Sequence, residues 1–253
     1  MVDVLIFGPH PDDIEILAGG LALRLADQGY TVGGVDMTRG EAGTRGTAEQ
    51  RAAEAVRGGE LLGLSFRENL GLPDGGLAAD EASRDLVIDA IRRHRPRLVV
   101  GPVPRGFHPD HVRTGQLLKD ARFLAGCSRI GPPGEPWRPG RVLQYPSRQP
   151  ELPDLVIDIS AYHDQKMEAV RAHASQLFNP DSSEQLTAIA SPGFLEGIEA
   201  RTRYYGSMIG ATHGEPFMLD GPIAVDDPVA AVRDKGEAVF RDIGAQRPAG
   251  SHG

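Results

Sequence analysis

The chain has 253 residues, and its 35 acidic side chains outnumber its 27 basic ones, which gives a formal net charge of −8. This balance argues against general binding to nucleic acids or to anionic membranes, because both partners require a positive face. No stretch approaches the roughly 18 apolar residues of a membrane-spanning helix, and the N-terminus lacks the basic region of a signal peptide, so we expect a cytoplasmic protein.

The first hundred residues alternate between predicted strands and predicted helices. Apolar runs predict strands at 2–8, 30–37, 65–70 and 98–103, and helical spacing predicts helices at 17–28, 47–62 and 80–94. Thr47 and Gln50 have the spacing of a capping box at the start of the second helix. Repeated βα units predict an α/β protein with a mainly parallel sheet, a Rossmann-like fold of three layers.

Beyond residue 130 the pattern is less regular. A loop rich in Gly and Pro precedes predicted strands at 141–145 and 154–159 and predicted helices at 162–175 and 192–209. We expect one domain over residues 1–220 and a C-terminal extension over residues 221–253. Roughly the last dozen residues are predicted to be disordered, so His252 is a poor candidate for a ligand.

A cluster of polar residues, Pro9-His10-Pro11-Asp12-Asp13, directly follows the first predicted strand. In a parallel sheet, the loops that leave the carboxyl ends of the strands bind the ligands. Taken alone, the cluster is equally consistent with a polar turn in which an aspartate caps the next helix. No G-x-G-x-x-G motif follows this strand, which disfavours binding of nicotinamide or flavin cofactors.

A second cluster with the same chemistry, His108-Pro109-Asp110-His111, follows the fourth predicted strand. By the same rule it lies at the same edge of the sheet as His10. Cys127 is the only cysteine, so a metal must be held by histidines and carboxylates. Three nitrogen or oxygen ligands with a water are typical of a catalytic zinc site, and the two clusters together therefore predict a metal site.

These two clusters, with Glu15 and Gly19-Gly20, resemble the PIG-L/LmbE-type zinc-dependent deacetylases, which remove acetyl groups from N-acetylglucosaminyl conjugates. The resemblance covers residues 2–219 and includes Thr38-Arg39-Gly40-Glu41, Arg51 with Glu54, residues 70–75, Ala172-His173-Ala174-Ser175-Gln176, Asn179-Pro180, Phe194-Leu195-Glu196, Glu199-Ala200-Arg201, Ile209-Gly210 and Glu215-Pro216-Phe217. The later motifs are most similar to the branch that deacetylates N-acetyl-α-D-glucosaminyl L-malate in bacillithiol biosynthesis.

The resemblance implies a role for each residue of the two clusters. The implied zinc ligands are His10, Asp13 and His111, the implied general base is Asp12, and the implied oxyanion stabiliser is His108. This division is chemically consistent, because Asp13 gives its lone pairs to the metal and leaves Asp12 free to accept a proton. Asp110 is expected to orient a neighbouring imidazole.

Three further residues resemble substrate-binding positions of the family: Arg51, Asp74 and His173. Each also has an ordinary structural interpretation, as a solvated helix arginine, a turn aspartate in Pro-Asp-Gly-Gly and a histidine of an amphipathic helix. The remaining internal histidines match no chemical pattern and are expected at the surface; they are His94, His163 and His213.

The positions before the second cluster depart from the family. Some relatives carry Arg or Tyr there, whereas this chain has Gly106 and Phe107, with Arg105 one step further away. The departure leaves the transition-state partner and the preferred aglycone open. A malate aglycone brings two carboxylates, which suits an arginine near the mouth of the site, and the candidates are Arg39, Arg45 and Arg105.

Together these features predict a metal-dependent amidohydrolase that releases acetate from an N-acetylglucosaminyl conjugate. The alternatives are deacetylation of another N-acetyl sugar (the mycothiol precursor, a chitooligosaccharide or a natural-product glycoside) and a non-catalytic sugar- or nucleotide-binding module. Zn²⁺ is the expected metal, although Fe²⁺, Co²⁺ and Mn²⁺ also suit a His₂Asp set. The expected partner is a small acetylated sugar, with no nucleic acid and no membrane, and the resemblance implies a homo-oligomer.

Overall fold

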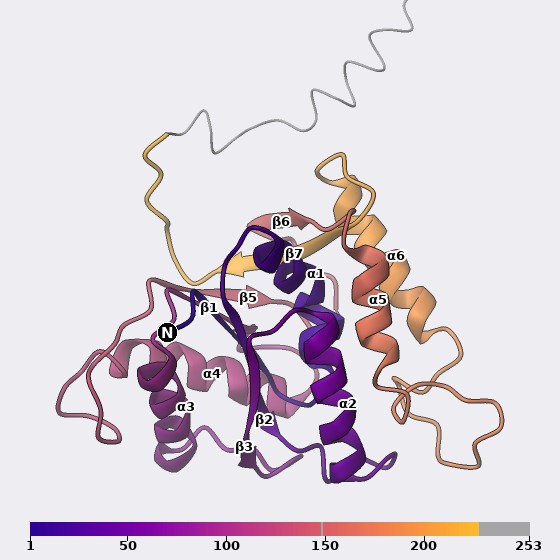
Figure 1. Cartoon of the computed structure of the whole chain (residues 1–253), viewed down its shortest axis with the longest axis horizontal. Helices are drawn as coiled ribbons and strands as arrows, with labels where there is room; N and C mark the ends of the chain where they lie inside the picture. The colour runs from indigo at the N-terminus through magenta and orange to yellow at the C-terminus, as the bar shows by residue number, and fades with distance from the viewer. Residues whose placement is uncertain (148, 228–253) are drawn as a thin grey trace, which may run out of the picture.

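One seven-stranded sheet forms the centre of the protein (Figure 1), whose structure, a computed structural model, describes residues 1–147 and 149–227. The strands are β1 (Val4–Gly8), β2 (Val32–Thr38), β3 (Phe66–Leu72), β4 (Leu98–Pro102), β5 (Arg141–Tyr145), β6 (Leu155–Asp158) and β7 (Gly214–Leu219). Their order is β3-β2-β1-β4-β5-β7-β6. The first five strands pair in parallel, whereas β7 runs antiparallel to both β5 and β6.

Helices cover both faces of this sheet. They are α1 (Asp13–Asp27), α2 (Ala48–Leu61), α3 (Glu81–His94), α4 (Pro109–Leu124), α5 (His163–Arg171) and α6 (Phe194–Ser207). Figure 1 shows α3 and α4 together on one side and α1, α2, α5 and α6 on the other. The prediction of a Rossmann-like, three-layer α/β fold is confirmed.

Strand β1 explains why the layers hold together. Its side chains alternate between the two faces: Leu5 and Phe7 pack with α3 and α4, whereas Val4 and Ile6 pack with α1. All four side chains are buried. A strand covered on both faces reads as a continuous apolar run, which is the pattern that predicted it from the sequence.

The sequence pattern did not predict α4 or β7. Helix α4 begins with the polar cluster at Pro109, and its buried face carries polar residues such as Thr114 beside Leu118, so it lacks a clear apolar stripe. Strand β7 begins Gly214-Glu215-Pro216, which has low strand propensity. The predicted N-cap of α2 is confirmed, because the Thr47 hydroxyl accepts from the Gln50 N–H at 3.1 Å.

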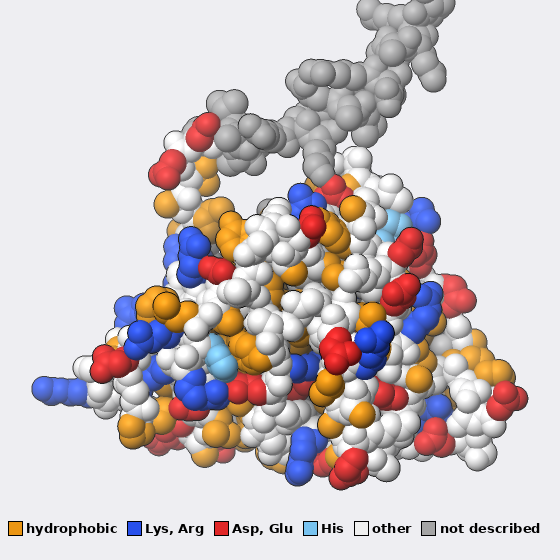
Figure 2. All heavy atoms as spheres, in the orientation of Figure 1, with side chains coloured by type: hydrophobic (Ala, Val, Ile, Leu, Met, Phe, Trp, Pro, Cys, Tyr) orange, Lys and Arg blue, Asp and Glu red, His pale blue; other side chains and the backbone are white. Residues whose placement is uncertain are grey.

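Charged side chains of both signs lie on the surface of the protein. On the face shown in Figure 2, acidic and basic side chains are interspersed and form no continuous basic surface. In the part of the chain that the structure describes, no helix combines the length and apolar character needed to cross a bilayer. The predicted disordered tail and His252 lie outside the described residues.

A buried ion pair joins β7 to the helices. Lys166 Nζ lies 2.5 Å from Glu215 Oε1 and donates to the Ile16 carbonyl at 2.8 Å. The Glu215 carboxylate also accepts the backbone N–H groups of Gly20 and Leu21, both at 2.8 Å. Because both charged side chains are almost fully buried, this contact fixes α5 and β7 against α1.

Replacing Lys166 by Met should therefore lower the free energy of unfolding by about 3–5 kcal/mol, because the substitution leaves the Glu215 charge buried without its cation. Lys119→Met makes the same chemical change at an exposed position and should leave the stability within about 0.5 kcal/mol of the parent. Equilibrium unfolding in urea measures both variants. Equal midpoints for the two variants would contradict the assignment.

Candidate active site

The two polar clusters meet because β1 and β4 are neighbours. These strands pair in parallel from Val4 opposite Leu98 to Ile6 opposite Val100, so both end at the same edge of the sheet. The loops that follow them carry His10 and His108, whose ring centroids lie 4.8 Å apart. The expected position of the site at the carboxyl edge of the strands follows directly from this pairing.

Two overlapping groups of side chains at this edge could hold a metal ion, one of His10, Asp13 and His111 and one of His10, His108 and Asp110; the first is the set that the resemblance implies. Asp13 Oδ2 lies 3.1 Å from His10 Nδ1 and 3.2 Å from His111 Nε2. In a tetrahedral zinc site with bonds of about 2.0–2.1 Å, neighbouring ligand atoms lie roughly 3.3 Å apart. The donor atoms and their separations therefore fit a divalent metal, as the sequence predicted.

The other nitrogen of His10 faces two carboxylates. His10 Nε2 lies 3.1 Å from Asp110 Oδ2 and 3.3 Å from Asp74 Oδ1. Burial opposes protonation of His10, but its hydrogen bonds to Asp110, Asp13 and Asp74 raise its pKa well above the usual value. A carboxylate behind a metal-binding imidazole fixes the ring and increases its basicity, which is the arrangement expected for Asp110.

Asp74, expected to bind sugar, is held by protein contacts on both of its oxygens. Besides the contact with His10, its Oδ2 accepts the Ala42 N–H at 2.9 Å. Asp110 accepts the Gly75 N–H at 2.8 Å through Oδ2, the same oxygen that faces His10 Nε2. The turn that contains Asp74 therefore lies directly against the metal-binding cluster.

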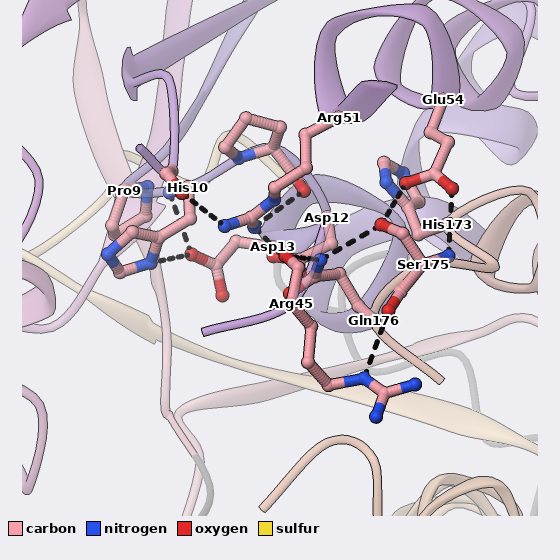
Figure 3. A network of polar contacts seen from close by, with 12 residues as sticks. Pro9, His10, Asp12, Asp13, Arg45, Arg51, Glu54, His173, Ser175 and Gln176 are labelled. Carbon is pink, nitrogen blue, oxygen red and sulfur yellow. Dashed lines mark hydrogen bonds and ion pairs between the residues drawn. The ribbon is translucent and has the colours of Figure 1, made fainter. Parts of the chain in front are cut away.

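Asp12 is buried and has an unusual backbone conformation, with φ of 150°. Arg51 Nη2 donates to Asp12 Oδ2 and to the Pro11 carbonyl, each at 3.2 Å (Figure 3). Burial and the neighbouring Asp13 raise the pKa of Asp12 to about 6, while Arg51 acts in the opposite direction. A strained, buried carboxylate with such a pKa has the properties of a general base near neutral pH.

Arg51 was expected to bind sugar, but the structure places its guanidinium inside the protein. The side chain is buried, and its Nη1 donates to the Gly40 carbonyl at 3.1 Å. Gly40 has φ of +67°, and a Cβ there would lie 2.0 Å from Arg51 Nη1, so only glycine leaves room for this arginine. The observed contacts make Arg51 a partner of Asp12.

His108 is the N-cap of α4, and its ring orientation can be derived from that role. Its Nδ1 accepts the Asp110 N–H at 3.3 Å, so Nδ1 carries no proton and the neutral ring carries its proton on Nε2. Burial and the neighbouring His10 and His111 lower the pKa of His108 and favour this neutral form. His108 therefore offers Nε2–H as a hydrogen-bond donor.

His173 lies behind Asp12 in a buried network of charged groups. Its Nε2 lies 3.3 Å from Glu15 Oε2, and Glu15 pairs with Arg67. Arg67 in turn donates two hydrogen bonds of 2.8 Å to Asp36. Although burial acts in the opposite direction, Arg67 and His173 lower the pKa of Glu15 to about 2. Arg67 and Asp36 were not among the predicted site residues. The one sign of their burial in the sequence is that each is a charged residue inside a predicted strand.

Arg45 does not line the mouth of the site as expected for an aglycone ligand. Its buried guanidinium donates to the backbone carbonyls of Ser175 and Leu177, at 3.1 and 3.3 Å. Gln176 Nε2 donates to the Arg45 carbonyl at 2.8 Å, and Glu54 accepts from Ser175, as Figure 3 shows. Arg45 therefore holds the segment after His173 in place.

Two of the histidines expected at the surface are buried. His163 is 4% exposed and His213 is 6% exposed, and their rings stack on each other. Both lie in contacts between segments that are distant in the sequence, so the local pattern gave no sign of their burial. His94 is half-buried and stacks on Phe66.

Replacing Asp13 by Ala should reduce the metal content of the purified protein by about one equivalent per chain, because the substitution removes one of three ligands. Asp12→Asn should leave the metal content unchanged, because Asp12 contacts Arg51 and is not part of the donor set. Elemental analysis after dialysis measures both variants. Equal metal contents for Asp13→Ala and the parent would exclude this ligand set.

The sequence and the fold of this chain are similar to those of known proteins. Residues 5–122 match the family model described as PIG-L: GlcNAc-PI de-N-acetylase. A diacetylchitobiose deacetylase of Thermococcus kodakarensis is 30% identical over 84% of this chain and 80% of its own length. A 1D-myo-inositol 2-acetamido-2-deoxy-alpha-D-glucopyranoside deacetylase of Rhodococcus jostii is 29% identical, over 69% of this chain and 81% of its own.

Further matches include another curated relative and a solved structure. A probable N-acetyl-alpha-D-glucosaminyl L-malate deacetylase 2 of Bacillus cereus is 30% identical over 68% of this chain and 83% of its own length. The crystal structure of a conserved protein of Thermus thermophilus superimposes with a TM-score of 0.82 at 38% identity, covering 90% of this chain and 98% of that one. The chain therefore belongs to the PIG-L family of de-N-acetylases.

Proposed function

We propose that this protein hydrolyses the acetamide of an N-acetylglucosaminyl conjugate and releases acetate and the free amine, with Zn²⁺ held by His10, Asp13 and His111. The observation that carries the proposal is the buried carboxylate of Asp12 directly beside this donor set. Three of the matched relatives, those of Thermococcus kodakarensis, Rhodococcus jostii and Bacillus cereus, are named as deacetylases of acetylated amino sugars and support the same reaction class.

Asp12 carries out both proton transfers of this reaction, and His108 donates a hydrogen bond. When bound, the metal ion supplies Lewis acidity, which lowers the pKa of a bound water and polarises the acetamide carbonyl. Asp12 accepts the proton of the attacking water and then transfers it to the departing sugar nitrogen. The Nε2–H of His108 donates to the carbonyl oxygen as negative charge develops there.

Arg51 positions the base in this scheme. Its guanidinium holds one Asp12 oxygen, and its charge favours the ionised carboxylate against the effects of burial and Asp13. The base therefore remains ionised near neutral pH without direct access to bulk water. Arg51 acts through Asp12 and needs no contact with the substrate.

Replacing Arg51 by Met should raise the pKa of Asp12, because an opposite charge next to a carboxylate lowers its pKa by about 1–3 units. Catalysis requires ionised Asp12, so the acid limb of kcat/KM should move to higher pH by about 1 unit or more. The matched control, Arg57→Met, changes an exposed arginine of α2 and should keep the profile of the parent. Unchanged acid limbs in both variants would exclude the positioning role.

For the substrate, we propose the malate conjugate of N-acetylglucosamine. The motifs after residue 170 support it by resemblance, and two of the three candidate arginines, Arg39 and Arg105, are exposed. Arg105 pairs with Glu151 at 2.9 Å, so a dicarboxylate would compete for a guanidinium that already binds a carboxylate. Local arginines are required because the net charge of −8 repels a dianionic substrate.

A panel of acetate-release assays should rank the substrates. We expect kcat/KM for the malyl conjugate to exceed that for the inositol conjugate and for diacetylchitobiose by about tenfold or more, the range that one well-placed charged contact supplies. The double variant Arg39→Met/Arg105→Met should raise KM for the malyl conjugate and leave KM for the inositol conjugate unchanged.

Two outcomes distinguish an error in the proposed substrate from an error in the proposed reaction. Acetate release from the inositol conjugate or from diacetylchitobiose, with none from the malyl conjugate, would exclude malate and keep the reaction. No acetate from any N-acetylated sugar by the zinc-loaded protein would exclude the deacetylase function itself.

A further inference from the structure

A further group of side chains that could hold a metal lies among the described residues, away from the candidate active site, and takes no part in the reaction proposed above. It consists of His163 at the start of α5, Glu199 in α6, and His213 just before β7. His163 Nε2 lies 2.5 Å from Glu199 Oε2, and His213 Nε2 lies 3.9 Å from Glu199 Oε1. Both imidazoles are buried, whereas the carboxylate is 38% exposed.

The hydrogen bonds of Thr202 determine which nitrogen of His213 carries the proton. The Thr202 hydroxyl donates its single proton to the Glu199 backbone carbonyl at 3.0 Å. Its contact of 3.0 Å with His213 Nδ1 must therefore be one in which Nδ1–H donates to the hydroxyl.

Neutral His213 consequently has a lone pair on Nε2, on the side of the ring that faces the Glu199 carboxylate. A lone pair and a carboxylate oxygen repel each other unless a proton or a cation lies between them. A histidine whose Nδ1–H is held by a protein oxygen while Nε2 is free is also the usual form of a metal ligand. The local chemistry at His213 therefore favours a cation.

The position of His213 is fixed by the backbone and does not depend on any ligand. Its N–H donates to Ser160 Oγ at 3.1 Å, which ties it to the end of β6. A Cβ at Gly206 would lie 2.8 Å from the His213 backbone nitrogen, so the glycine allows α6 to pack directly against this segment. The three side chains come from α5, from α6 and from the residue before β7, so the backbone brings them together without a ligand.

An acidic cavity opens beside this group. It has a volume of about 600 Å³ and lies between α5 and α6, with His163 and Glu199 in its lining. Its other charged lining residues are Asp164, Glu168, Glu196 and one arginine, Arg171. The excess of carboxylates attracts cations, and the cavity gives water access to His163 and Glu199.

We propose that His163, Glu199 and His213 form a second metal site, which binds a divalent ion such as Zn²⁺ or Co²⁺ through both Nε2 atoms and the carboxylate. Two imidazoles and a carboxylate with water suit these ions. Binding through Nε2 displaces the proton that His163 donates to Glu199, and Nδ1 takes up a proton, so the ring binds as a neutral imidazole. The ion links α5 to α6 and to β7.

Binding also changes the arrangement of the two rings. They now stack with centroids 3.6 Å apart and an angle of 8° between their planes. A shared metal must lie near both ring planes, so the rings must open towards a tilt such as the 40° between His10 and His111. A crystal structure of the zinc-loaded protein would show this change directly.

Metal stoichiometry tests the second site. The untagged full-length protein, dialysed against Zn²⁺ and analysed for metal, should bind about two ions per chain, whereas Glu199→Gln should bind about one. His94→Ala is the matched control, because His94 also pairs with a glutamate, Glu68, but lies outside both metal groups, and it should still bind two.

A second measurement separates this site from the candidate active centre. In an Asp13→Ala background, Zn²⁺ should raise the melting temperature, because an ion that binds only the folded state stabilises it. Adding Glu199→Gln to that background should abolish the increase. One ion per chain in the parent protein, or equal metal contents in the parent and Glu199→Gln, would overturn the proposal, and neither result bears on the deacetylase function.

Discussion

The adjacency of β1 and β4 is the constraint on which the functional site depends. Since both strands are parallel and central, the loops after them must meet at one edge of the sheet. His10 Nε2 lies 3.1 Å from Asp110 Oδ2, although the two residues are 100 positions apart in the sequence. Strand β1 is buried on both faces, so it cannot shift without exposing Leu5 or Ile6 to water. The stability of the core and the geometry of the donor atoms therefore have the same origin.

Two neighbouring buried aspartates have pKa values shifted in opposite directions, because they face different partners. Asp12 and Asp13 are both buried, but they face opposite partners. Burial and Asp13 raise the pKa of Asp12 to about 6, whereas the histidines outweigh burial and hold the pKa of Asp13 well below its usual value. These opposite pKa shifts suit the roles proposed for the two residues, Asp12 as a proton acceptor and Asp13 as an anionic metal ligand. Two adjacent residues with pKa values displaced in opposite directions are typical of acid–base sites.

Among the described residues, the other buried charged side chains have ion-pair or hydrogen-bond partners. These contacts connect the layers. Arg67 lies between Glu15 and Asp36 behind the site, and Lys166 meets Glu215 where β7 joins the sheet. Removing one member of such a pair leaves a buried charge, which is why single substitutions there are strongly destabilising. These pairs could not be predicted from sequence, because each unites residues from different elements, and a lone Arg67 or Lys166 is normally a surface residue.

The sequence by itself determined the elements other than α4 and β7, the capping of α2 by Thr47, and the two clusters that contain the donor atoms, because these depend on local patterns and on the rule that parallel strands end at one edge. Only the tertiary structure decided that Arg51 contacts Asp12, that Arg45 is buried, and that His163 and His213 stack inside the protein. Burial and side-chain contact are properties of packed neighbours, which lie far apart in the chain and leave no local pattern.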